Sequence, residues 1–184
     1  MNTQKIAFAG IIGALYASLT IALNFIGYGP VQFRVAEALC VLPFFFPFSA
    51  LGLFVGCVAA NLMSPFPLDI AIGPIATLIA ALCTAMLAKL GRDRLIIKTL
   101  ACLPPVIINS LAIGALIAFY TTGINNTEET ITFLTAFLIN MAQVGFGELV
   151  VMYALGLPLL ICLSRLTAFQ RVVKQFSPPT GRID

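Results

Sequence analysis

The sequence predicts an all-α integral membrane protein, a single membrane domain over residues 1–184 that crosses the bilayer six times. The first observation is composition, because 60% of the residues are hydrophobic and 9% are charged, with a mean hydropathy of +1.06. Soluble domains carry about 25% charged residues, so this chain has too few to cover a water-facing surface. The second observation is a series of apolar stretches of crossing length, and the third is the clustering of basic residues.

Four of the five long apolar stretches each have the length of one transmembrane helix. A crossing helix needs about 20 mostly apolar residues. The first stretch follows Lys5 and exceeds a signal-peptide core of roughly 7–15 residues, so we interpret it as a retained membrane helix. The stretches cover residues 6–28, 35–63, 70–88, 95–120 and 131–163.

The second stretch is too long for one crossing and short for two, and Pro43 and Pro47 interrupt its helical hydrogen bonding. Basic residues favour the cytoplasmic side, so three basic clusters should all lie there. Lys5 and the cluster that starts at Lys89 then need an even number of crossings between them. We therefore predict two short helices that turn near Pro47–Ala50 on the inner side. The clusters are Lys5; Lys89, Arg92, Arg94 and Lys98; and Arg165, Arg171, Lys174 and Arg182.

The predicted topology has six transmembrane helices, both termini cytoplasmic, and a cytoplasmic tail at 165–184. Its outer loops hold Asp69, Glu128 and Glu129 but only one basic residue, Arg34, which fits an external face. Each half of the short helix pair spans about 21 Å, so the pair must tilt, thin the bilayer or line a cavity. No internal repeat is visible, which disfavours an inverted-repeat transporter. The predicted helices cover about 4–28, 34–47, 50–63, 69–89, 98–121 and 130–164.

Ionisable residues inside or at the edge of these helices are candidates for function, namely Arg34, Glu37, Asp69 and Glu148. Each costs at least about 2.5–3.5 kcal/mol at the bilayer centre, so such residues usually have a role. Arg34 and Glu37 are three residues apart and could pair on one helix face, in a ligand site or as a structural pair at the outer interface. Glu148 lies about 26 Å from Arg165 along a helix, which places it in the outer half.

Amide and aromatic side chains accompany these charges. Asn109, Asn140 and Gln143 either bind a ligand or form interhelical hydrogen bonds, and Gly145 and Gly147 let other groups approach Glu148. A carboxylate accepts two parallel hydrogen bonds, such as a guanine-like edge offers, and aromatic side chains stack on rings. The pocket would therefore suit a planar, donor-rich or cationic ligand. The aromatic candidates are Phe33, Phe44, Phe45, Phe137 and Phe146.

The first predicted helix carries two rows of small residues with a spacing of four. Small residues at this spacing form a flat stripe that another helix can approach closely. The stripe either packs inside this bundle or docks against another membrane subunit. One row is Ala9, Gly13 and Ala17, and the other is Gly10, Ala14 and Ser18.

Several chemistries are disfavoured by what the sequence lacks. There is no histidine, and the five cysteines are widely spaced, so neither a metal site nor a cofactor is expected. Without histidine or a ligand cluster, catalysis has little support. No phosphate-binding loop of the GxxxxGK type is present, so ATP hydrolysis by that route is excluded.

Five segments together resemble the QueT family, the substrate-binding S components of energy-coupling factor (ECF) transporters. The first is the first-loop motif at residues 28–39 (YGPVQFRVAEAL). The others are 52–57 (GLFVGC), Asp69 with Gly73 and 76–78 (ATL), 103–106 (LPPV) with Asn109, and 145–149 (GFGEL). Each segment alone is weakly specific, whereas their order and spacing over nearly the whole chain are fairly specific.

The resemblance implies a six-helix bundle in the cell membrane with an outward-facing pocket that the first loop closes. It implies a queuosine precursor as substrate, a deazaguanine base with or without an aminomethyl group, held by Glu37 and Glu148 with Asp69 third. It also implies three partners, a membrane coupling subunit and two cytoplasmic ATPase subunits, and no nucleic acid. In such families the stripe of the first helix, here Ala9, Gly13 and Ala17, meets the coupling subunit, and the S component topples in the membrane to release its cargo.

Three other functions remain open at this stage. The chain could be an S component for another vitamin, such as riboflavin or thiamin, although the first-loop motif argues against it. It could be an intramembrane enzyme that uses Glu37 and Glu148 as acid and base on a lipid or isoprenoid substrate. It could also be a small channel or assembly subunit in which the buried carboxylates line a pore.

Overall fold

The computed structural model describes residues 2–27, 31–123 and 132–176, and every regular element within these ranges is a helix. The all-α class predicted from composition is therefore confirmed for the described part of the chain. The expected acidic loop residues Glu128 and Glu129 lie outside the described residues.

The helices follow one another along the chain with short connections. Two are 3-10 helices, η1 of 10 residues and η2 of 3 residues, and one, η3, is a π-helical turn. The bounds are α1 Thr3–Ala22, α2 Asn24–Gly27, η1 Val35–Phe44, α3 Ser49–Asn61, α4 Asp69–Leu87, η2 Ala88–Leu90, α5 Leu95–Ala101, α6 Leu103–Gly123, α7 Phe133–Val151, η3 Met152–Gly156, α8 Leu157–Arg165 and α9 Thr167–Phe176.

Four helical segments in the described ranges are long and apolar enough to cross a membrane, namely Thr3–Ala22, Asp69–Leu90, Leu95–Thr122 and Phe133–Arg165. The stretch with ambiguous length folds as two shorter apolar helices, η1 and α3. The break between them lies at residues 45–48, where Pro47 has no amide proton for a helical hydrogen bond. Six crossings with both termini in the cytoplasm, and a single domain over 1–184, stay predictions.

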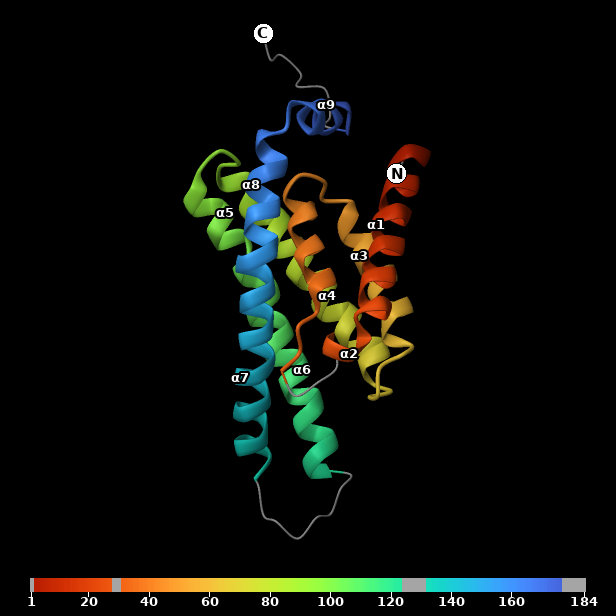
Figure 1. The fold of residues 1–184 in the computed structure, drawn as a ribbon, viewed down its shortest axis with the longest axis vertical. Helices are drawn as coiled ribbons and strands as arrows, with labels where there is room; N and C mark the ends of the chain where they lie inside the picture. Colours follow the sequence, from red (N-terminus) through yellow and green to blue (C-terminus); the bar gives the residue numbers. More distant parts are fainter. Residues whose placement is uncertain (1, 28–30, 124–131, 177–184) are drawn as a thin grey trace.

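The described residues of the predicted basic clusters gather at one end of the bundle, while Arg182 lies outside the described residues. Figure 1 shows the start of α1, the turn between η1 and α3, helix α5 and helix α9 at the same end. Lys5 stacks over the ring of Phe48 in that turn at 5.7 Å, and Lys98 donates to the hydroxyl oxygen of Ser164 at 2.8 Å. This arrangement agrees with the common side that the charge pattern predicted for these clusters.

Helices α1 and α3 touch backbone to backbone along a seam of small residues. A Cβ atom on Gly13 would lie 2.6 Å from the carbonyl oxygen of Gly52, and one on Gly52 would lie 2.8 Å from the carbonyl carbon of Ala9. Ala9 and Gly13, which we expected at a partner interface, are thus covered by α3, while Ala17 is half-buried. The face of α1 that stays exposed carries the second row, Gly10, Ala14 and Ser18.

Helix α9 was expected only as part of a tail, yet it forms an amphipathic helix across the end of the bundle (Figure 1). Its apolar side packs on the turn after η1, where the rings of Phe46 and Phe169 are 5.5 Å apart. The opposite side of α9 carries the exposed residues Arg171 and Lys174. The spacing of Phe169, Val172, Val173 and Phe176 is the helical period that could have predicted this element.

Candidate functional site

The four ionisable residues singled out from the sequence are all buried. The exposed fractions are 5% for Arg34, 0% for Glu37, 1% for Asp69 and 2% for Glu148. A buried charged group needs hydrogen bonds or an opposite charge, so the partners of each carboxylate define what it can do.

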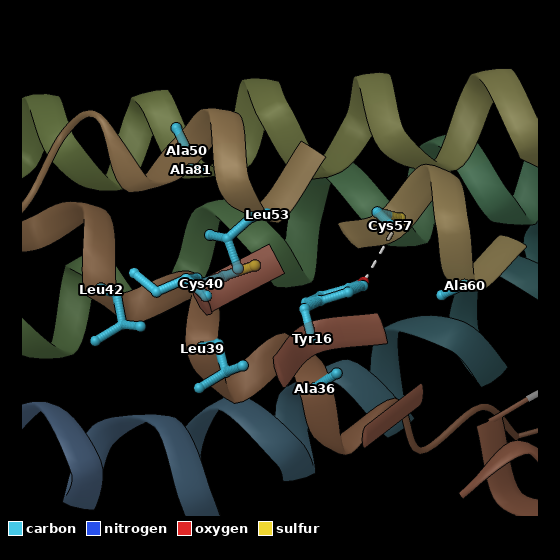
Figure 2. Close-up of a cluster of buried hydrophobic side chains, with 11 residues drawn as sticks. Tyr16, Ala36, Leu39, Cys40, Leu42, Ala50, Leu53, Cys57, Ala60 and Ala81 are labelled. Atoms are coloured by element: carbon cyan, nitrogen blue, oxygen red, sulfur yellow. Dashed lines mark hydrogen bonds between the residues drawn. The ribbon is translucent and has the colours of Figure 1, made fainter. Parts of the chain in front are cut away.

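Glu37 is held by hydrogen-bond donors from three other positions in the core. The phenol O–H of Tyr16 donates to its Oε1, and the Cys40 thiol donates to its Oε2 at 3.0 Å. The Thr77 hydroxyl lies 3.5 Å from Oε1. Tyr16 also reaches the sulfur of Cys57 at 3.6 Å, the contact drawn in Figure 2. Both oxygens of Glu37 are therefore satisfied by α1, α4 and η1 itself.

Arg34 pairs with Asp69 and not with Glu37. Its Nη2 lies 2.9 Å from Asp69 Oδ2, and the Ser64 hydroxyl donates to the same oxygen at 2.9 Å. The predicted pairing within one helix face is wrong because Arg34 precedes η1, with φ −80° and ψ 85°, so helical spacing does not apply to its side chain. Asn61 holds the backbone of Asp69 through a 2.8 Å bond to the carbonyl oxygen.

The side chain of Glu148 on α7 contacts that of Asn109 on α6, and an interhelical hydrogen bond was one of the two roles predicted for this amide. The Asn109 amide donates to Glu148 Oε1 at 3.2 Å. Among the described residues the other oxygen, Oε2, is buried without a hydrogen-bond partner. A buried oxygen in this state is rare in native proteins and indicates a missing partner such as water or a ligand. We call the carboxylate of Glu148 open, because one of its oxygens has no hydrogen-bond partner among the described residues. We call that of Glu37 closed, because both of its oxygens accept hydrogen bonds.

The segment before η1 crosses α7 next to Glu148. A Cβ atom on Gly147 would overlap the carbonyl oxygen of Gln32, so only glycine lets the segment lie this close. The rings of Phe33 and Phe146 meet edge to face at 6.5 Å. The first-loop motif and the GFGEL motif therefore meet in space.

The remaining amides lie apart from this convergence. Asn140 donates to the carbonyl oxygen of Ala136 in its own helix at 2.8 Å, and both Asn140 and Gln143 are half-buried. They sit about 12 Å and 8 Å along α7 from Glu148. Tyr16 and Gln32 were not singled out from the sequence, although Tyr16 is a lone phenol inside the first apolar stretch and Gln32 lies within the first-loop motif.

The fold and the site define a helical membrane protein with a buried cluster of carboxylate, guanidinium and amide groups beneath a connecting segment. The QueT transporter family matches residues 6–165, so this chain belongs to the QueT transporter family. Membership confirms the resemblance found in the five sequence segments.

A relative found among characterised proteins has the same family name. The queuosine precursor transporter QueT of Lactococcus lactis subsp. cremoris (strain MG1363) is 37% identical over 80 residues. The matched region covers 42% of this chain and 47% of that protein, so it spans about half the length of the relative. No solved structure matches this chain.

Proposed function

We propose that this chain is the substrate-binding S component of an ECF-type importer and that it captures a queuosine precursor, a deazaguanine base, from outside the cell. The observation that carries the proposal is Glu148, oriented by Asn109 at 3.2 Å and with one buried oxygen open, in a member of the QueT transporter family. The name of the Lactococcus relative supports the substrate.

The chemistry of a deazaguanine base fits this locus. Its ring N–H and exocyclic amino group are adjacent donors, and an ionised carboxylate accepts from such a pair with charge-assisted hydrogen bonds. Phe33 and Phe146 pack on each other where the segment before η1 crosses α7, but Phe146 is 59% exposed and two residues before Glu148, so its ring faces away from that carboxylate. An aminomethyl cation would find its counter-charge in Glu148 or Asp69, whose Oδ1 is also without a hydrogen-bond partner in the described ranges.

Delivery needs partner subunits in this proposal, namely a membrane coupling subunit and two cytoplasmic ATPases, which together topple the S component in the cell membrane. The exposed row Gly10, Ala14 and Ser18 offers the coupling subunit a close approach, in place of the covered Ala9 and Gly13 and the half-buried Ala17. An apolar groove of about 380 Å³ runs beside that row, lined by Ile6, Ala9, Gly10, Leu51, Gly52 and Val55.

The rival functions fit the geometry less well. An intramembrane enzyme would need Glu37 to reach a substrate, but both of its oxygens accept bonds from Tyr16, Cys40 and Thr77. A pore would need the carboxylates to face a continuous channel. An S component for another vitamin keeps the same fold, so only ligand binding separates it from the leading proposal.

The test is ligand binding to the purified protein in detergent, comparing the aminomethyl deazaguanine, guanine and riboflavin. We expect tight binding of the deazaguanine, lost in Glu148→Gln and kept in the control Asp93→Asn, whose side chain is exposed in a loop. If Glu148→Gln binds the deazaguanine as tightly as wild type, the proposed substrate stands but Glu148 is not part of the binding site. Tight binding of riboflavin instead, or of none of the three, would overturn the proposed substrate.

A further inference from the structure

We propose that Gln32 is a specificity-determining contact. Its side-chain oxygen and the open oxygen of Glu148 would form two acceptors that read adjacent hydrogen-bond donors on one edge of the ligand. The proposal rests on the proposed function, because it assigns contacts within the same capture site.

The first argument is burial without a partner. Gln32 is 3% exposed, and its Oε1 has no hydrogen-bond partner within the described part of the chain. Glu148 is 2% exposed, and its Oε2 is in the same state. Burying an acceptor without a partner costs free energy, so two such oxygens in one region indicate a ligand that supplies donors to both.

The second argument is position. The backbone of Gln32 lies directly on Gly147, and a Cβ atom there would come within 2.8 Å of the Gln32 carbonyl carbon. Gly147 immediately precedes Glu148, so the two open side chains start from backbone positions that touch. Glycine at position 147 therefore lets the segment before η1 lie against α7 next to the open carboxylate of Glu148.

The third argument is that most of the other buried carboxylate oxygens are already occupied. Glu37 accepts from Tyr16 and Cys40, and Asp69 Oδ2 accepts from Arg34 and Ser64. Glu148 Oε1 accepts from Asn109, which fixes the direction of its other oxygen. A ligand that reaches both side chains therefore meets Gln32 Oε1 and Glu148 Oε2 as unpaired acceptors, with Asp69 Oδ1 as a further one among the described residues.

This pairing predicts a specific selectivity. A site that buries an acceptor rejects an analogue that lacks the matching donor, because the acceptor is then left unpaired. The wild-type protein should therefore bind the aminomethyl deazaguanine at least about 10-fold more tightly than the same base without its exocyclic amino group or with its ring N–H methylated. Gln32→Met keeps the side-chain volume and removes the acceptor, so one of these two preferences should collapse.

The experiment measures affinities for the three bases in detergent, first for wild type, Gln32→Met and Gln175→Met, a matched control exposed on α9. The expected result is a loss of about 10-fold for the full ligand in Gln32→Met, with little change for the analogue that lacks the donor read by Gln32. Gln32→Asn, which keeps an acceptor on a shorter side chain, should fall between the two.

Gly147→Ala tests the position of Gln32, because it displaces the segment that carries this side chain without removing an acceptor. It should reduce the same preference that Gln32→Met removes, since the Gln32 oxygen is moved away from the open oxygen of Glu148. If Gln32→Met weakens all three equally, or changes none, Gln32 does not read the ligand and the inference is wrong while the proposed function stands. If wild type binds no deazaguanine, the proposed function and the inference fail together. Monodisperse elution of each variant shows that it is folded.

Discussion

Glu37 and Glu148 are both buried acidic side chains, yet the hydrogen-bond donors around them differ. Glu37 is surrounded by donors from its own chain, with Tyr16 and Cys40 on separate oxygens. Glu148 has one oxygen fixed by Asn109 and the other open. The comparison teaches that burial alone does not separate a binding carboxylate from a structural one. In the proposed function, the number of donors that the protein itself supplies makes that distinction.

The largest effect is expected at the ion pair beside these carboxylates. Arg34→Met would leave Asp69 buried without its counter-charge, and breaking a buried pair on one side costs about 3–5 kcal/mol. Thermal unfolding in detergent should show a large fall in melting temperature. The double variant Arg34→Met with Asp69→Asn should recover part of the loss. A double variant no more stable than Arg34→Met would contradict the assigned pairing.

Glu37→Leu should be the next most destabilising change, by about 2–4 kcal/mol, because it leaves the hydroxyls of Tyr16 and Thr77 buried without an acceptor. Glu37→Gln keeps an acceptor and should cost less. Both are measured by thermal unfolding. A Glu37→Leu protein as stable as wild type would mean that the Tyr16–Glu37 contact does not hold α1 against η1.

The helices and the ionisable residues of the candidate site could be predicted from the sequence, but the partners of those residues could not. The apolar stretches and their proline breaks indicated the helices, because bilayer thickness and helical hydrogen bonding constrain chain length. The ionisable residues of the site could be chosen because a charge in an apolar helix is costly. Their partners could not, because Arg34 and Asp69 are 35 residues apart and meet only through the packing of η1 on α4.

The contacts between helices could also be predicted only in part. The spacing of Ala9 and Gly13 predicted a close helix approach, and α3 provides it through Gly52. Nothing in the spacing says whether the approaching helix belongs to this chain or to a partner. Likewise, Gln32 lies in a segment without regular periodicity, and its burial depends on Gly147, more than a hundred residues later in the sequence.

Tyr16→Phe isolates one contact of the closed carboxylate and should have a smaller effect on stability. Removing one hydrogen bond to a charged group costs about 1.5–3 kcal/mol, while the ring keeps its packing in the core. Ligand affinity should remain within about twofold, since a change of that size is below 0.5 kcal/mol. Isothermal titration of the deazaguanine against Tyr16→Phe and wild type makes the check. A large loss of affinity would place the Glu37 cluster in the ligand site.

Glu148→Gln should have the smallest effect on stability, less than about 1 kcal/mol, because the new side-chain oxygen still accepts from Asn109. Its effect on ligand affinity should be about 10- to 100-fold, since the ligand loses hydrogen bonds to a charged acceptor. Melting temperature and affinity are therefore measured on the same preparations of Glu148→Gln and Glu37→Gln. If the open carboxylate serves the ligand and the closed one serves the fold, each variant fails mainly in its own measurement. A Glu148→Gln protein that melts early and binds normally would reverse the assignment, because the Glu148 carboxylate would then serve the helix bundle and not the ligand.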